Sequence, residues 1–201
     1  MSAETILSSN LFKKCRDFHG HLCPGLAMGY QAAVAGMQWL AARRSEDEEI
    51  VAVVETDACG CDAIQVITGC TFGKGNFIYR DYGKQAFTFF NRDTGQGVRV
   101  ARKAEPQEPL DPEHRRLLDK IRQDSATPEE RAEFDRRHEA ACRRILDQAP
   151  EALFTLTAVT VPLPEKARIE PSVPCARCGE PTMATKMETL DGRQVCRGCL
   201  T

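Results

Sequence analysis

The C-terminal end of the chain carries four cysteines in two closely spaced pairs. Cys175 and Cys178 form a Cys-x2-Cys pair, and after 17 residues Cys196 and Cys199 form a second pair. This is the spacing of a zinc ribbon, in which each pair points two thiolates at one ion and two pairs complete a tetrahedron. Because the protein would fill all four positions, the pattern predicts a structural zinc; a dithiol redox pair is the alternative.

A second group of chemically capable residues lies near the start of the chain, in the stretch FHGHLCPG at 18–25. Pro24 suits the first position of a helix, which makes Cys23 the N-cap residue. The positive end of the helix dipole would then lower the pKa of the Cys23 thiol. His19 and His21 alternate, so both would point to one side of an extended segment, as metal ligands or as a base beside the thiolate. The alternative is an ordinary helix start with a buried cysteine and solvated histidines.

Further cysteines follow at the junctions of predicted strands and helices. Cys59 and Cys61 come after a predicted buried strand, at the start of a short helix, and Cys70 comes directly after that helix. Such junctions are where sheet proteins place their sites. We therefore expect Cys59 and Cys70 to converge with His19, His21 and Cys23 on one core site. By contrast, Cys15 and Cys142 lie on helices among apolar neighbours and are predicted to be structural.

The hydrophobic pattern predicts an α+β fold: a mixed helix and sheet core, followed by a small zinc-ribbon domain. Helices are expected over 4–17, 24–43 and 61–69, and strands over 49–55, 76–80, 86–91, 97–103 and 152–161. We divide the chain into a core at 1–161, a linker with four prolines at 162–174 and a zinc ribbon at 175–201. Within the ribbon, Asp191-Gly192 predicts the turn of a hairpin.

Two charged helices interrupt the core at about 106–150 and form a predicted arm. Asp111-Pro112 and Thr127-Pro128 each read as an N-cap followed by a proline, and Glu130 completes a capping box with Thr127. The arginines of the second helix are interspersed with acidic residues, which favours a solvated face over a nucleic-acid surface. We expect this arm to contribute to a dimer.

The composition indicates the cellular compartment and the chemistry of the cysteines. The chain has 10 cysteines in 201 residues, a net charge of −2 and no N-terminal basic and apolar run typical of a signal peptide. No apolar stretch is long enough to cross a membrane. These features predict a cytoplasmic protein, where disulfides rarely persist and clustered cysteines favour metal binding or redox chemistry.

Three motifs carry a family resemblance: FHGHLCPGLAMGYQAA, DACGCDAIQVITGCTFGKGN and PEKARIEPSVPCARCGE. Together they resemble the FmdE family of formylmethanofuran dehydrogenase proteins, named for its association with a molybdenum or tungsten enzyme. The resemblance implies an α+β core, often in an intertwined homodimer, with a C-terminal zinc finger in some members. It also implies two sets of ligands, a core site of His19, Cys23, Cys59 and Cys70 with His21 close by, and zinc on Cys175, Cys178, Cys196 and Cys199.

The leading hypothesis is a metal-binding accessory or sensor protein with a second transition metal in its core site, linked to formylmethanofuran dehydrogenase-type metabolism. It would act as a homodimer or with another protein partner, away from membranes. One alternative is an enzyme, in which Cys23 is a nucleophile or metal ligand and His19 or His21 the acid or base. Another is a regulator whose ribbon binds nucleic acid or protein, using the cations Arg177, Lys186, Arg193 and Arg197.

Overall fold

The computed structural model describes residues 1–104 and 111–200. The chain folds into two compact units, Met1–Lys166 and Ala167–Thr201, which we describe separately. The division falls within the segment 162–174 that the sequence suggests as a linker. Helices and sheets are both present in the first unit, so the predicted α+β class is confirmed.

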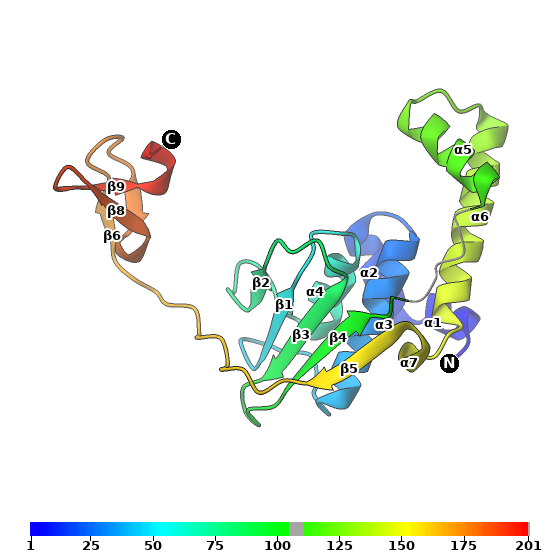
Figure 1. The fold of residues 1–201 in the computed structure, drawn as a ribbon, viewed down its shortest axis with the longest axis horizontal. Helices are drawn as coiled ribbons and strands as arrows, with labels where there is room; N and C mark the ends of the chain where they lie inside the picture. Colours follow the sequence, from blue (N-terminus) through cyan, green and yellow to red (C-terminus); the bar gives the residue numbers. More distant parts are fainter. Residues whose placement is uncertain (105–110, 201) are drawn as a thin grey trace. The chain divides into compact units, whose positions relative to one another are not determined.

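The first unit is built on one five-stranded sheet with the order β2-β1-β3-β4-β5. Its strands are β1 (Ile50–Val54), β2 (Phe77–Tyr79), β3 (Ala86–Asn91), β4 (Gly97–Arg102) and β5 (Phe154–Ala158). β1 and β2 are parallel, and the other neighbouring pairs are antiparallel. A parallel pair needs a crossover connection, which α4 (Gly60–Thr68) supplies between β1 and β2 (Figure 1).

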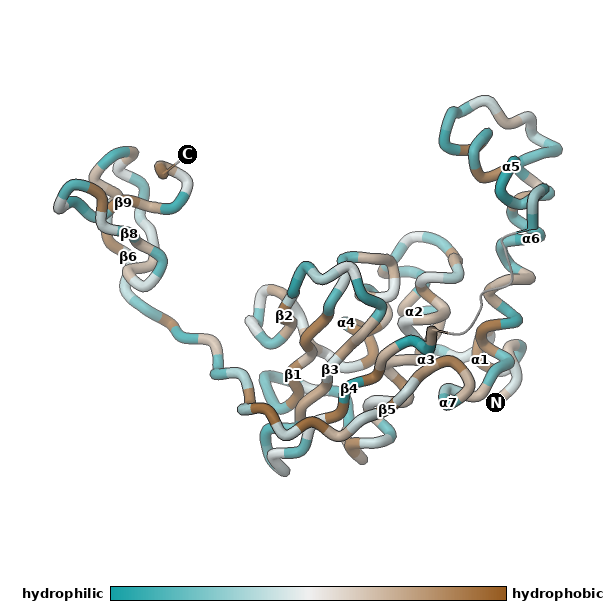
Figure 2. Tube along the Cα trace, in the orientation of Figure 1, coloured by the Kyte–Doolittle hydropathy of each residue, from teal (hydrophilic) through white to brown (hydrophobic). Residues whose placement is uncertain are grey.

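One face of the sheet carries the main core. The alternating residues Ala52, Val54, Phe87 and Phe89 pack on that face with α3 (Pro24–Trp39) and α4. Val51, Val53 and Phe90 point to the opposite face, where Val159 and Leu163 from the chain after β5 pack against them. Figure 2 shows the hydrophobic colouring along the central strands. The helical layer therefore lies on a single face, and it carries the candidate core site.

The N-terminal helix predicted over 4–17 is in fact two helices, α1 (Ala3–Ser8) and α2 (Asn10–His19). Ser9 divides them, because its extended backbone ends α1 while its hydroxyl accepts the N–H of Phe12 as the N-cap of α2. α3 is shorter than predicted and ends at Trp39. Buried Gln31 of α3 donates to the carbonyls of Ile145, Leu146 and Gln148, which holds α3 against the end of α6.

The arm is a helical hairpin of α5 (Pro112–Arg122) and α6 (Pro128–Leu146). Both predicted N-caps are present, and Thr127 and Glu130 form the predicted capping box. The proposed beginning of the arm, before residue 111, lies outside the described residues. A one-turn helix, α7 (Pro150–Leu153), follows and leads into β5.

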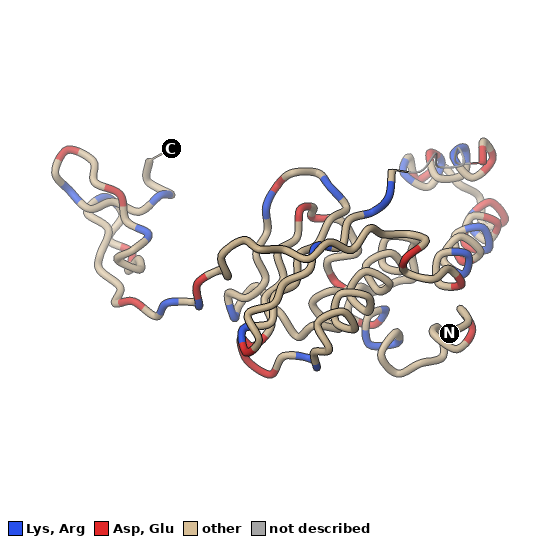
Figure 3. Tube along the Cα trace, turned by 60° about the horizontal axis from the view of Figure 1, so that its bottom comes forward, with Lys and Arg blue, Asp and Glu red and all other residues tan. Residues whose placement is uncertain are grey.

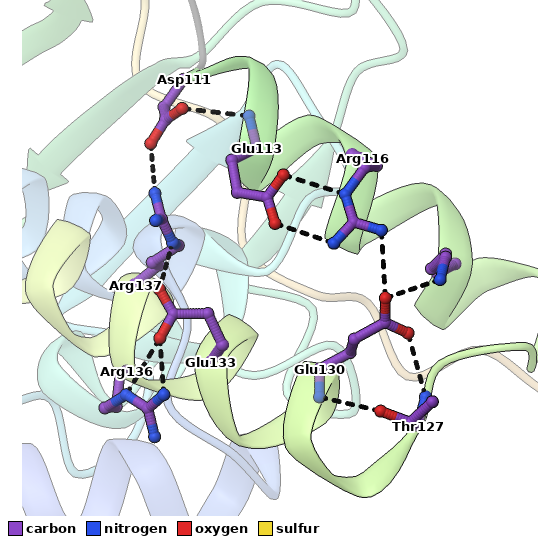
Figure 4. A network of polar contacts seen from close by, with 9 residues as sticks. Asp111, Glu113, Arg116, Thr127, Glu130, Glu133, Arg136 and Arg137 are labelled. Atoms are coloured by element: carbon purple, nitrogen blue, oxygen red, sulfur yellow. Dashed lines mark hydrogen bonds and ion pairs between the residues drawn. The ribbon is translucent and has the colours of Figure 1, made fainter.

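Basic and acidic residues are interspersed along the arm (Figure 3). Glu130 accepts a hydrogen bond from Arg116 at 3.0 Å (Figure 4) and another from Lys120 at 2.6 Å, and so joins α6 to α5. Arg137 bonds both Glu133 and Asp111, which adds a second link between α6 and the start of α5. Each exposed pair contributes little alone, but the network fixes the two helices together.

The second unit contains two small hairpins. β6 (Ser172–Pro174) pairs with β7 (Pro181–Met183), and β8 (Met187–Leu190) pairs with β9 (Arg193–Cys196). Short 3-10 turns cover Ala184–Lys186 and Arg197–Cys199. Asp191 and Gly192 have φ of 48° and 74°, as the predicted turn requires. The last three residues of the expected linker form β6, so they belong structurally to the second unit.

None of the helices in the described residues is both long enough and apolar enough to cross a membrane.

Candidate metal centres

The four C-terminal cysteines meet at one point. The sulfurs of Cys175 and Cys199 are 3.9 Å apart, as are those of Cys178 and Cys196, and all four lie within 4.8 Å of one another. Zn–S bonds of about 2.3 Å in a tetrahedron place the sulfurs about 3.8 Å apart. The cluster therefore fits a tetrahedral ion, and its chemistry, four thiols with no open position, is that of a structural site.

Hydrogen bonds from the backbone favour the thiolate form of Cys175. N–H groups from Cys178, Cys196 and Arg177 point at its sulfur and lower the pKa of Cys175 to about 6. The crowded neighbours have the opposite effect on Cys199, whose pKa rises to about 12, chiefly through the Cys196 thiol. Four thiolates repel one another at this distance, so a cation is needed to hold them together.

Two ribbon cations already have partners inside the ribbon. The guanidinium of Arg177 donates to the carbonyl of Cys199, and Arg197 pairs with Glu188 at 3.1 Å. Both contacts support the loops that carry the ligands. The ion pair of Arg197 with Glu188 also reduces the positive charge that the ribbon offers to a nucleic acid.

The core cluster lies at the junction of α2 and α3. His19 is the last residue of α2, Cys23 is the N-cap of α3, and Gly20, with φ of 92°, turns the chain between them. The ligand atoms of His19, His21 and Cys23 lie within 4.8 Å of one another. The rings of the two histidines are 4.4 Å apart at their centroids, although His19 ends a helix and the two residues do not lie in the extended segment predicted from the sequence.

A hydrogen-bonded series connects three side chains of this cluster. Nδ1 of His19 lies 2.7 Å from Oδ2 of Asp62, and its Nε2 lies 3.5 Å from the sulfur of Cys23. Asp62 thus fixes the tautomer that leaves Nε2 of His19 directed at the thiol, the arrangement common for metal-bound imidazoles. Asp62 was missing from the sequence prediction, although it lies one helical turn after Cys59.

The ionisation of Cys23 differs from the sequence prediction. Burial raises its pKa to about 11, and this outweighs the N–H of Leu26, which lies 3.3 Å from the sulfur and lowers the pKa. The nearby thiol of Cys59 raises it further. The helix start does supply a hydrogen bond to the Cys23 sulfur, but the effect of desolvation on the pKa is larger. A bound cation would therefore be needed to keep this sulfur ionised at neutral pH.

Cys59 lies beside Cys23 because α3 and α4 approach closely, although it is not among the residues whose ligand atoms all lie within 4.8 Å of one another. A methyl group at Gly25 would lie 3.6 Å from the Cys59 sulfur and 3.8 Å from the Cys23 sulfur, so Gly25 borders the space between them. Deeper in the same contact, a Cβ at Gly29 would lie 2.2 Å from the carbonyl oxygen of Gly60. These glycines allow backbone to meet backbone, which brings the N-terminal ends of both helices together.

Cys70 does not belong to this cluster, contrary to the prediction. It follows the C-terminal end of α4, whose nine residues span about 13 Å, whereas Cys59 precedes the N-terminal end. The Cys70 thiol donates to the carbonyl of Ile50 at 3.3 Å and is fully buried. Cys61 likewise donates to the carbonyl of Thr56 at 3.1 Å and has a raised pKa of about 12, first because of burial. Both cysteines contribute to packing.

The architecture is thus an α+β protein with an open Cys/His cluster in its core unit and a closed four-cysteine ribbon. The family model described as "FmdE, Molybdenum formylmethanofuran dehydrogenase operon" matches residues 18–155, and the chain belongs to this family.

Two individual proteins are similar over most of the chain. A probable S-adenosyl-L-methionine-binding protein from Archaeoglobus fulgidus is 33% identical over 187 residues, which is 90% of this chain but only 50% of the relative. The crystal structure of an FmdE-like protein of the tungsten formylmethanofuran dehydrogenase type, from Syntrophus aciditrophicus, is 26% identical, with a TM-score of 0.59. That match covers 100% of this chain and 97% of the other.

Proposed function

We propose that this protein is a metal-binding accessory or sensor protein, with an exchangeable transition metal in the core cluster and a structural zinc in the ribbon. The observation that carries the proposal is the grouping of His19, His21 and Cys23 at the junction of α2 and α3, with Cys59 close to Cys23. Imidazole and thiolate together suit Zn²⁺ and its neighbours in the first transition series. Exposed His21 gives the cluster a solvent-facing ligand, so an ion can enter and leave.

Metal analysis of anaerobically purified protein tests this proposal. We expect two ions per chain in the wild type, one in Cys23→Ala and one in Cys175→Ser. A single ion per chain that disappears with Cys175→Ser and persists in Cys23→Ala would contradict the core site. The two variants serve as controls for each other because they lie in separate units.

The partner and setting belong to the same proposal. Family membership favours work beside a formylmethanofuran dehydrogenase-type enzyme, and the helical arm suits a homodimer contact. Ten free cysteines favour the cytoplasm, where thiols stay reduced. Sedimentation equilibrium of the full chain tests the dimer: a monomer mass at all concentrations would contradict it.

A second candidate function is nucleophilic catalysis by the Cys23 thiol. In this arrangement Cys23 would be the nucleophile, His19 the base and Asp62 the carboxylate that orients the base. The raised pKa of Cys23 argues against it. Alkylation of the metal-free protein separates the two: a metal-site thiol should react slowly at neutral pH and faster towards pH 11. Fast reaction at neutral pH, slowed by His19→Gln, would favour the enzyme.

A further inference from the structure

The chain has four histidines, and they form two pairs of neighbouring rings, both in the first unit. His19 and His21 belong to the core cluster. On the arm, His114 of α5 and His138 of α6 have ring centroids 5.7 Å apart. Phe134 lies 4.7 Å from the ring of His138 and 5.3 Å from that of His114, so the arm pair is held against an aromatic ring.

α6 packs against α3 near the core cluster, because Cys142 of α6 and Cys23 belong to one cluster of buried side chains. Burial lowers the pKa of His138, and repulsion from His114 and then from His21 lowers it further. Cys142 lies one turn further along α6; its pKa is raised to about 12 by burial and then by the charge of Cys23. His138 and Cys142 therefore lie on the part of α6 that packs near Cys23, and His138 is close enough to His21 for their charges to repel.

Packing alone does not account for an imidazole at position 138. Its Nδ1 is enclosed and has no hydrogen-bond partner, and no other side-chain nitrogen or oxygen in the described residues is in this state. An enclosed polar atom without a partner is unfavourable, whereas a phenyl ring would stack on Phe134 without that cost. A neutral imidazole nitrogen is, however, a good ligand for a transition-metal ion.

We propose that His114 and His138 capture an incoming transition-metal ion and pass it to His21, which delivers it to the core cluster. This inference rests on the proposed metal function. Each step exchanges one ligand: an imidazole nitrogen replaces a bound water, and the next imidazole replaces the previous one, with no change in oxidation state. Within the described chain, the arm histidines and His21 do not form a closed three-ligand group, so the ion would stay there only briefly.

Stopped-flow loading with Co²⁺ tests the inference, because thiolate ligation at the core cluster gives cobalt a distinct absorption. In the double variant His114→Gln/His138→Gln we expect loading to slow severalfold, with the same final amount bound. Release to a chelator should slow by the same factor, since the two residues lie on the path and not in the final ligand set. The equilibrium affinity should therefore be unchanged.

Two further variants separate capture from packing. His138→Phe keeps the ring stack with Phe134 and removes the nitrogen, so it should melt like the wild type and still load slowly. Ala140→Gln places the same amide side chain on the exposed face of α6 and should load normally. Unchanged loading rates in His138→Phe and in the double variant, with the core ion still bound, would overturn this inference alone. Absence of a core ion in the wild type would overturn the proposed function as well.

Discussion

The carboxylate of Asp62 holds Nδ1 of His19 at 2.7 Å, and the same ring turns its other nitrogen towards Cys23. The two residues come from different helices, so this bond ties the end of α2 to the first turn of α4. A carboxylate behind a ligand histidine orients the ring and strengthens it as a ligand.

Replacing Asp62 by Asn should weaken the core metal site and leave the ribbon untouched. We expect the affinity of the core site to fall about 10- to 100-fold, the usual effect of losing such a supporting group. Competition with a coloured chelator measures this affinity. Asp57→Asn, which alters an exposed acid shortly before α4, is the control. An Asp62→Asn protein that holds its core ion as tightly as the wild type would show that Asp62 does not support the site.

Gly29→Ala should disrupt the packing of α3 on α4. The added methyl would lie 2.2 Å from a backbone oxygen of Gly60, so the helices must separate. Overpacking of this kind typically costs about 1–3 kcal/mol of unfolding free energy. We also expect loss of the core ion, because Cys23 and Cys59 would move apart.

Urea unfolding and metal analysis check the Gly29→Ala prediction together. Gly73→Ala is the matched control, because a Cβ at Gly73 has no heavy atom within 4 Å. Equal stability of the two variants would show that the helix contact can relax without cost.

Removal of one ribbon ligand should unfold the second unit and leave the first unit intact. The ribbon buries few apolar side chains, so its folding free energy must come from the ion. For Cys175→Ser we expect rapid protease cleavage within 175–200 and an unchanged melting transition of the first unit. Cys23→Ser should show the reverse pattern of metal loss with a protease-resistant ribbon. A ribbon that resists protease in Cys175→Ser would mean that it folds without the ion.

The ion pair of Glu55 and Arg99 makes the folding stability of the first unit depend on pH. Arg99 of β4 donates two hydrogen bonds to the Glu55 carboxylate, at 2.8 and 2.9 Å, and these lower the pKa of Glu55 below its usual 4.5. Because the folded-state pKa is the lower one, this stabilisation is present above pH 4.5 and is lost as the pH falls through the folded value.

Glu55→Gln should therefore flatten the acid side of the stability curve. At neutral pH the loss should be on the order of 1 kcal/mol or less, since Arg99 is partly exposed. Chemical unfolding at a series of pH values measures both effects. Glu151→Gln, which alters an exposed acid beside the sheet, should keep the wild-type pH dependence. An unchanged acid slope in Glu55→Gln would show that other carboxyl groups control it.

The features that could be predicted from the sequence are local ones. Three such features depend on a few neighbouring residues, and the structure contains each of them. They are the helix start at Cys23 and Pro24, the capping box of Thr127 and Glu130, and the Asp191-Gly192 turn. The Cys-x2-Cys pairs also determine their own geometry. The division of the first helix at Ser9 was missed because serine fits both a helix interior and an N-cap.

The core site was only partly predictable because it depends on contacts between distant segments. Cys59 and Cys70 look equivalent in the sequence, but α4 separates them by its own length. The raised pKa of Cys23 follows from burial, which a helix-dipole argument does not include. Asp62 could have been found by placing it one turn after Cys59, on the side of α4 that meets α2.

The contact of Gly29 with Gly60 makes the site tolerant of substitutions elsewhere in the core. Two helices that touch through side chains shift whenever those side chains are replaced. Here the separation is set by main-chain atoms, so the spacing of Cys23 and Cys59 does not depend on which apolar residues fill the rest of the core. Substitutions throughout that core can therefore accumulate while the distance between the two sulfurs stays constant.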